Sequence, residues 1–159
     1  MFHRWAALVL VLALCAISPK NAAGHTQSAQ PRGTSGGIGK NYPNPFNPST
    51  TIPFVVGDTA NNCANDRQQH VVTLQIRNIL AQTLGIPILW GPAAGVTTSA
   101  PASLSGQAVN GVTLSCGVYA SYWDGNVRNT TREAASGMII AVLSIDGKVA
   151  GTLRMYNKK

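Results

Sequence analysis

The chain has 159 residues, 45% of them hydrophobic, and a formal net charge of +7. This length favours one folded domain with a modest core. The charge balance would suggest nucleic acid as a partner, but no basic run exceeds two residues and no aromatic side chains are interleaved with the basic ones. We therefore expect a solvated basic surface and no nucleic-acid partner.

The first 24 residues, "MFHRWAALVLVLALCAISPKNAAG", predict an export signal. A basic start at Arg4 precedes an apolar run over residues 6–17, and small residues follow, with cleavage expected near Gly24. The run is too short to span a bilayer comfortably, so we expect no stable membrane span in the mature protein. Cleavage leaves ten Lys and Arg against five Asp and Glu. A basic exported chain meets anionic envelope polymers and membrane surfaces, and we expect it in the periplasm, on the cell surface or outside the cell.

Residues 25–40 are rich in Ser, Gly, Thr and Gln, which predicts a flexible leader. The folded domain is expected over residues 41–159. It begins with "NYPNPFNPSTTIPF", residues 41–54, in which four prolines exclude helix and favour an extended, kinked entry into a strand. Phe46, held between two prolines, is the expected apolar anchor of this entry.

Alternating apolar side chains predict strands over residues 51–56, 71–78, 83–90 and 112–125. Pro53 and Pro87 place the first and third of these at sheet edges, because proline cannot donate a ladder hydrogen bond. Residues 91–111 are poor in large side chains and predict a long loop.

Two further apolar runs, residues 137–145 and 148–156, are joined by Asp146-Gly147, a dipeptide suited to a type I′ hairpin turn. No segment longer than one turn shows helical periodicity. Short strands with glycine and proline turns predict an all-β fold, an antiparallel β-sandwich of about seven strands.

Two cysteines remain after signal removal, Cys63 and Cys116, and a lone pair in an oxidising compartment usually forms a disulfide. A zinc site from these cysteines and His70 would lack a fourth ligand and any CxxC spacing. One loop groups oxygen ligands without the spacing of a calcium loop, so solvated turns explain it with fewer assumptions. That loop contains Asp58, Asn61, Asn62, Asn65 and Asp66. We expect no metal and no cofactor.

His70 is the one histidine of the expected domain and could join Asp58 or Asp66 and a serine in catalysis. No nucleophile-elbow sequence is present, and His70 is expected at the surface where a strand opens. Paired carboxylates for glycoside hydrolysis would have to come from Asp58, Asp66, Asp124, Glu133 and Asp146. Asp124 and Asp146 are explained as turn residues, and we predict that the protein is not an enzyme.

Exposed aromatic side chains offer a different use, because they could stack on sugars. The candidates are Trp90, Tyr119, Tyr122 and Trp123. Tyr119 and Trp123 share one strand face and are expected in the core instead.

Four motifs occur in a fixed order along the chain. They are "NYPNPFNPSTTI", the turn in "LQIRNILAQTL", the pattern Gly117-x-Tyr119-x-x-x-Trp123-Asp124-Gly125, and "ASGMIIAVLSIDGK" before a lysine-rich end. Together they resemble the FlgD-like immunoglobulin domain, named for the flagellar hook-capping protein, and the C-terminal sorting domains of type IX secretion. The resemblance covers roughly residues 40–159 and implies an immunoglobulin-like sandwich. The motif residues expected to be structural are Tyr42, Pro43, Asn44, Pro45, Phe46, Asn47, Pro48, Tyr119, Trp123, Asp124, Gly125 and Gly137.

The chain departs from the family pattern at three positions. Ala81 stands where the turn normally carries glycine, Ser121 where an aliphatic is usual, and Ile139 where an aromatic is common. If the turn position needs a positive φ, alanine there costs about 1 kcal/mol.

The resemblance implies a non-catalytic module for cell-surface sorting, anchoring or assembly. Domains of this family usually lie at the C-terminus of exported or surface proteins, and type IX machinery in the outer membrane reads some of them as an address. The expected partner is an envelope or secretion-machinery protein, and the short leader favours a small free-standing exported protein. The alternative is a secreted carbohydrate-binding or adhesive β-sandwich with a surface polysaccharide as its partner.

Overall fold

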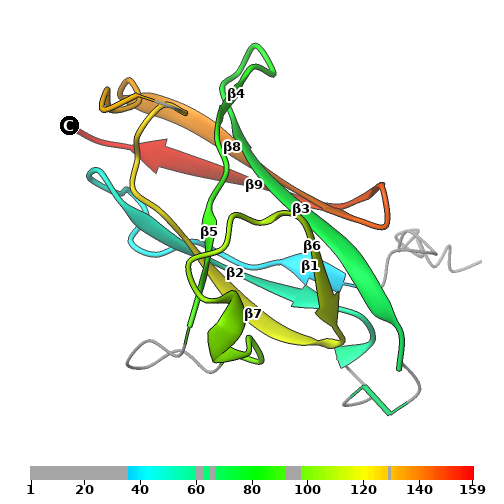
Figure 1. Ribbon diagram of the computed structural model, residues 1–159. Helices are drawn as coiled ribbons and strands as arrows, with labels where there is room; N and C mark the ends of the chain where they lie inside the picture. Colours follow the sequence, from blue (N-terminus) through cyan, green and yellow to red (C-terminus); the bar gives the residue numbers. More distant parts are fainter. Residues whose placement is uncertain (1–35, 60–62, 65–66, 92–97, 129) are drawn as a thin grey trace, which may run out of the picture. The chain divides into compact units, whose positions relative to one another are not determined.

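Two antiparallel β-sheets pack against each other in the computed structural model, which describes residues 36–59, 63–64, 67–91, 98–128 and 130–159 (Figure 1). The first sheet has the order β1 (Gly36–Ile38), β2 (Thr50–Val56), β7 (Gly117–Trp123), β5 (Ile88–Trp90). The second has the order β4 (Thr83–Gly85), β3 (Gln69–Arg77), β8 (Gly137–Ile145), β9 (Lys148–Asn157), and β6 (Asn110–Ser115) also pairs with β3. The prediction of an all-β antiparallel sandwich is confirmed.

The core lies between the sheets and is built from alternate residues of each strand. In β3, Val72, Leu74 and Ile76 are fully buried, whereas the residues between them face outward, as the period of two requires. The first sheet contributes Ile52 and Phe54 of β2 to the same cluster. The apolar alternation read in the sequence therefore marks the inner face of both sheets.

The described residues form nine strands, not about seven. Two of the predicted strands each divide into two, because the chain changes sheets partway along them. The predicted strand at 112–125 breaks at Cys116 into β6, which pairs with β3, and β7, which pairs with β2 and β5. The predicted strand at 83–90 breaks at Ile86 and Pro87 into β4 and β5 in the same way. A crossing of one or two residues leaves apolar runs on both sides, so the pattern does not reveal it.

The additional strand β1 lies in the segment predicted to be a flexible leader. It pairs with β2 and packs beside β9, where a Cβ on Gly151 would come within 2.8 Å of the Ile38 Cγ2 atom. Gly36, with φ +143°, has no room for a side chain, because a Cβ would lie 2.5 Å from both the Val55 oxygen and the Ile145 Cδ1 atom. Gly36, one of the glycines that suggested a leader, is thus required by close packing.

Pro53 does not mark an edge strand, since β2 lies between β1 and β7. The Pro53 carbonyl accepts a hydrogen bond of 2.8 Å from the Gly39 amide, just after β1 has ended. The nitrogen and carbonyl of a strand residue point to the same side, so the missing N–H faces the end of β1 and no ladder bond to β7 is lost. For Pro87 the edge prediction holds for the strand that follows it, because β5 is the last strand of its sheet.

Cys63 and Cys116 form the predicted disulfide, with their Cα atoms 5.7 Å apart. The bond joins the loop before β3 to the residue at which the chain crosses from β6 to β7. On the loop-closure model, a cross-link over 53 residues stabilises the fold by about 4 kcal/mol through the unfolded chain. Within the described ranges no helix has the length and apolar character needed to cross a membrane.

The turn between β3 and β4 is organised by one side chain. The Asn78 Oδ1 atom accepts hydrogen bonds from the Leu80 and Gln82 amides at 3.0 and 2.9 Å, and its Nδ2 donates to the Gln82 side chain at 2.8 Å. Ala81, at the position where the resembling family carries glycine, has a φ of +62°. Alanine is disfavoured in this left-handed region by contact between its Cβ and the backbone.

Replacing Ala81 with glycine should therefore stabilise the protein. We expect Ala81→Gly to raise the free energy of unfolding by about 0.5 to 1 kcal/mol, because the relief of strain exceeds the added entropy of the unfolded chain. Urea denaturation of both proteins measures the difference. The control is Ala135→Gly, an exposed alanine without positive φ, which should not stabilise. Equal or lower stability of Ala81→Gly would contradict the strain at this turn.

Candidate functional site

The proline motif connects β2 of the first sheet to the end of β9 in the second sheet. Tyr42 exchanges two backbone hydrogen bonds of 2.9 Å with Thr51 at the start of β2. Phe46 donates its amide to the Tyr156 carbonyl and accepts the Lys158 amide, both at 2.9 Å, and so lies beside the end of β9. The segment therefore covers part of the outer edge of β9 while remaining attached to β2.

The same motif meets the Trp-Asp-Gly motif inside the sandwich. The Phe46 side chain is 1% exposed and packs edge-on against Trp123, with ring centroids 5.7 Å apart. A Cβ on Gly125, which has φ +83°, would overlap the carbonyl oxygen of Pro48. Phe46 is thus buried at the position where the sequence predicts an apolar anchor, and Gly125 is explained by the close approach of the proline motif.

The other motif residues have structural positions. Asn44 accepts the Tyr156 amide at 3.1 Å, and Tyr119 is buried and stacks on Phe54. Gly137 has a φ of +133° at the start of β8. Tyr42, Pro43, Asn44, Pro45 and Asn47 are exposed, and the peptide bonds before Pro43, Pro45 and Pro48 are cis.

Two of the departures from the family pattern fit the core without a large change. Ser121 is fully buried, and its hydroxyl donates to the Ile52 carbonyl at 3.1 Å, so the polar group is satisfied. Ile139 is 3% exposed and belongs to the core cluster.

His70 is buried, which corrects the expectation of a surface residue. Its Nδ1 atom lies 2.7 Å from the Asp146 Oδ2 atom, and the other carboxylate oxygen of Asp146 accepts the Val71 amide at 2.9 Å. The hydrogen bond with His70, followed by that from Val71, lowers the pKa of the Asp146 carboxyl below its ordinary value. Asp146 and Gly147, with φ of +51° and +75°, form the predicted turn between β8 and β9, so this carboxylate also ties the turn to β3.

Three of the carboxylates considered for catalysis each bind a different partner. Asp124 accepts two hydrogen bonds from Asn126, Glu133 pairs with Lys159 at 3.2 Å, and Asp146 binds His70. The side chains of the oxygen-rich loop, Asn61, Asn62, Asn65 and Asp66, lie outside the described residues. In the described part of the chain, no three His, Cys, Asp or Glu side chains are grouped to hold a metal ion. The disulfide removes both thiolates from the zinc hypothesis.

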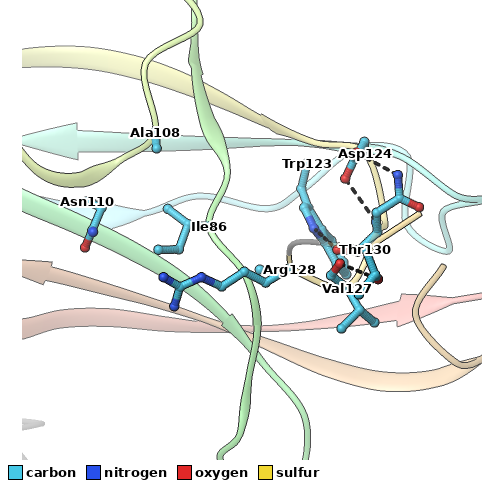
Figure 2. Close-up of a pocket in the computed structure, with 10 residues that line it drawn as sticks. Ile86, Ala108, Asn110, Trp123, Asp124, Val127, Arg128 and Thr130 are labelled. Carbon is cyan, nitrogen blue, oxygen red and sulfur yellow. Dashed lines mark hydrogen bonds between the residues drawn. The ribbon is translucent and has the colours of Figure 1, made fainter. Parts of the chain in front are cut away.

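A polar groove lies where the chain leaves β4 and β7 (Figure 2). Its hollow has a volume of about 380 Å³ and includes Gly85, the indole of Trp123, and five polar side chains. These polar side chains are Asn110, Asp124, Asn126, Arg128 and Thr130. Figure 2 shows the Arg128 side chain extending toward Ile86 and Asn110, away from the hydrogen-bonded cluster around Asp124. Arg128 is exposed, and among the described residues its guanidinium forms no ion pair.

A second hollow of about 200 Å³ continues this groove toward the outer face of the first sheet. It shares Ile86, Trp123 and Asp124 with the first hollow and adds Ile88 and Tyr122. The Tyr122 ring lies 4.8 Å from that of Trp90, which is 37% exposed. Of the four sugar-stacking candidates, the structure thus places Trp90 and Tyr122 together at the surface and buries Tyr119 and Trp123, as predicted for the latter two.

This arrangement is suited to recognition of a polar ligand. Aromatic rings can pack on the apolar face of a sugar, while amide, carboxylate and guanidinium groups can bind its hydroxyls. The polar residues come from β6 and from the loop after β7. Their separation in the sequence gave no signal of a shared groove.

Truncation of the anchor tests the junction between the two motifs. Phe46→Ala should lower the free energy of unfolding by about 3 to 5 kcal/mol, because a buried aromatic ring is lost and a cavity remains. Gly125→Ala should also destabilise, and the double variant should lose less than the sum of the two, since they act on one contact. Denaturant unfolding measures each value, with Tyr42→Ala, an exposed aromatic of the same motif, as the control. An unchanged midpoint for Phe46→Ala together with lost retention at the cell surface would make the motif a recognition element instead.

Comparison with known proteins gives one weak structural likeness. No family model matches the sequence, and no curated protein matches it. Among solved structures, the chain is similar to the alkylpurine DNA glycosylase AlkC of Pseudomonas fluorescens bound to DNA containing an abasic site analog. The match has 14% identity and a TM-score of 0.39, and it covers 80% of this chain and 31% of the glycosylase chain.

The prediction that the protein is not an enzyme is contradicted by this match, because the matched protein is a DNA glycosylase, and we withdraw it. The chain spans about a third of the length of that enzyme. At a TM-score of 0.39, neither DNA binding nor glycosylase activity is transferred to this chain.

Proposed function

We propose that the protein is an exported immunoglobulin-like module that serves in cell-surface sorting, anchoring or assembly. The observation that carries this proposal is the contact between the two motifs of the family resemblance. Phe46 packs on Trp123, and Gly125 leaves room for Pro48, so the two motifs form one packed junction. Such a junction favours common descent with the resembling family over a chance coincidence of short motifs.

Two independent features support export. The Cys63–Cys116 disulfide suits an oxidising compartment, in which such bonds persist. The N-terminal sequence combines a basic start, an apolar run and small residues, which is the pattern of a signal peptide. A basic surface suits attachment to anionic envelope material.

Cell fractionation with N-terminal sequencing tests the proposal. We expect the protein in the envelope fraction, with a mature N-terminus near His25 and the disulfide formed. Leu12→Arg, which interrupts the apolar run, should leave the protein in the cytoplasm with an intact Met1. Cytoplasmic location of the unaltered chain with Met1 retained would contradict export, and mature protein found wholly in the medium would contradict attachment.

Carbohydrate binding is the second candidate, and the groove beside Trp90 and Tyr122 favours it. The aromatic pair adjoins Asp124, and Asn126 and Arg128 line the rest of the groove, which combines the two kinds of contact that sugars require. In this reading the surface polysaccharide itself would be the partner to which the module attaches.

Retention of the folded protein on immobilised envelope polysaccharide tests this second candidate. Trp90→Ala should weaken retention about fivefold or more, since stacking on one aromatic ring contributes on the order of 1 kcal/mol or more. Tyr42→Ala, an exposed aromatic away from the groove, should leave retention unchanged. Equal retention of both variants would exclude the groove as the binding site.

A further inference from the structure

The two most exposed large hydrophobic side chains of the described chain are neighbours. Ile79 is 66% exposed and Leu80 is 73% exposed, whereas the other exposed large hydrophobics range from 37% to 59%. Both stand at the tip of the turn between β3 and β4, which projects beyond the sheets at the top of Figure 1. Two adjacent aliphatic side chains in water at a loop tip are unfavourable unless a partner covers them.

The turn holds this pair in a fixed position. The Asn78 side chain binds the Leu80 and Gln82 amides, and the Asn78 amide donates to the Gln82 carbonyl at 3.0 Å. The strain at Ala81 is part of the same conformation. The exposure of Ile79 and Leu80 is therefore a property of the folded turn.

Further apolar side chains continue from the tip along the second sheet. Ile79 and Met138 line a hollow of about 730 Å³ between the turn and the start of β8. Met138 is paired with Tyr156 across β8 and β9, so their side chains share one face, and both are exposed. We call Ile79, Leu80, Met138 and Tyr156 the tip patch.

Cationic side chains surround the tip patch. Arg132 and Lys159 line the hollow, and its one carboxylate, Glu133, is paired with Lys159. Arg77 and Arg154 stand on either side of Ile140 in the register of β3, β8 and β9, two pairs along from Met138 and Tyr156 and so on the same face. No described carboxylate forms an ion pair with Arg77, Arg132 or Arg154. The surroundings of the tip patch are thus positively charged.

From this combination we propose that the tip patch docks on an anionic phospholipid surface. Ile79 and Leu80 enter the boundary of the acyl chains, Tyr156 lies at the level of the headgroups, and the cations bind lipid phosphates. A lipid surface suits these observations better than a folded protein does. The aliphatic pair projects and suits a deformable apolar phase, and the cations are dispersed over β3, the loop before β8 and the segment from Arg154 to Lys159. This inference rests on the proposed surface attachment, for which it names the partner.

Vesicle sedimentation with the disulfide-bonded protein tests the docking. We expect binding to vesicles of phosphatidylcholine with phosphatidylglycerol, and at least about tenfold weaker binding to phosphatidylcholine alone. The double substitution Ile79→Ser and Leu80→Ser should weaken binding to the anionic vesicles about tenfold or more, because the inserted apolar area is lost. The matched control combines Val71→Ser and Val149→Ser, two exposed aliphatics outside the tip patch, and should bind as the unaltered protein does. All variants share the same N-terminal residues, so a difference in their vesicle binding arises from the substituted side chains.

Two further measurements support the interpretation of vesicle binding. Thermal unfolding should show that both double variants remain folded, and Leu80→Trp should retain binding and shift its fluorescence to the blue on anionic vesicles.

Equal binding of the two double variants, or equal binding to neutral and anionic vesicles, would overturn the proposal. Binding to a soluble anionic polysaccharide with none to vesicles would also overturn it, in favour of a polymer partner. Vesicle binding by a protein that fractionates with the cytoplasm would refute surface attachment and leave the docking surface standing, whereas envelope location without vesicle binding would do the reverse.

Discussion

The rest of the structure depends on the contact of Phe46 with Trp123. Beside this contact, Pro48 packs closely against Gly125. Trp123 is the last residue of β7, at the centre of the first sheet, and Phe46 lies beside the end of β9, at the edge of the second. One aromatic pair therefore sets the distance and alignment of the two sheets at this end of the sandwich. The indole also lines the polar groove, so the geometry of that groove follows from the same contact.

The opposite end is held by different means. Asp146 joins the hairpin between β8 and β9 to β3 through His70 and the Val71 amide, and the disulfide joins the loop before β3 to the crossing at Cys116. The first link is polar and the second is covalent. Together with the aromatic junction they leave the turn at Asn78 to Gln82 and the groove as the main features that the core does not explain. These are the features to which we assign interactions.

The parts of the fold that could be predicted are those written in local patterns. The alternation of Val72, Leu74 and Ile76 indicated a half-buried strand, and Asp146-Gly147 indicated a tight hairpin, since both depend only on neighbouring residues. The crossings at Cys116 and Pro87 could not be predicted, because an apolar run has the same appearance in one sheet or in two. The burial of His70 depends on a partner 76 positions away, and the groove joins side chains of separate segments, so neither has a local signal.

The proline motif has a consequence for the behaviour of many copies of the protein at close quarters. The ten-residue strand β9 is the last strand of its sheet, and such a strand offers unpaired amides and carbonyls to any other chain. Phe46 occupies the backbone groups of Tyr156 and Lys158, and the prolines on either side of it have no amide to offer a further strand. At this end of β9, the segment thus both covers the edge of the sheet and leaves few backbone groups for a further strand to bind. Molecules crowded on a surface are thereby protected from edge-to-edge pairing and aggregation along this end of β9.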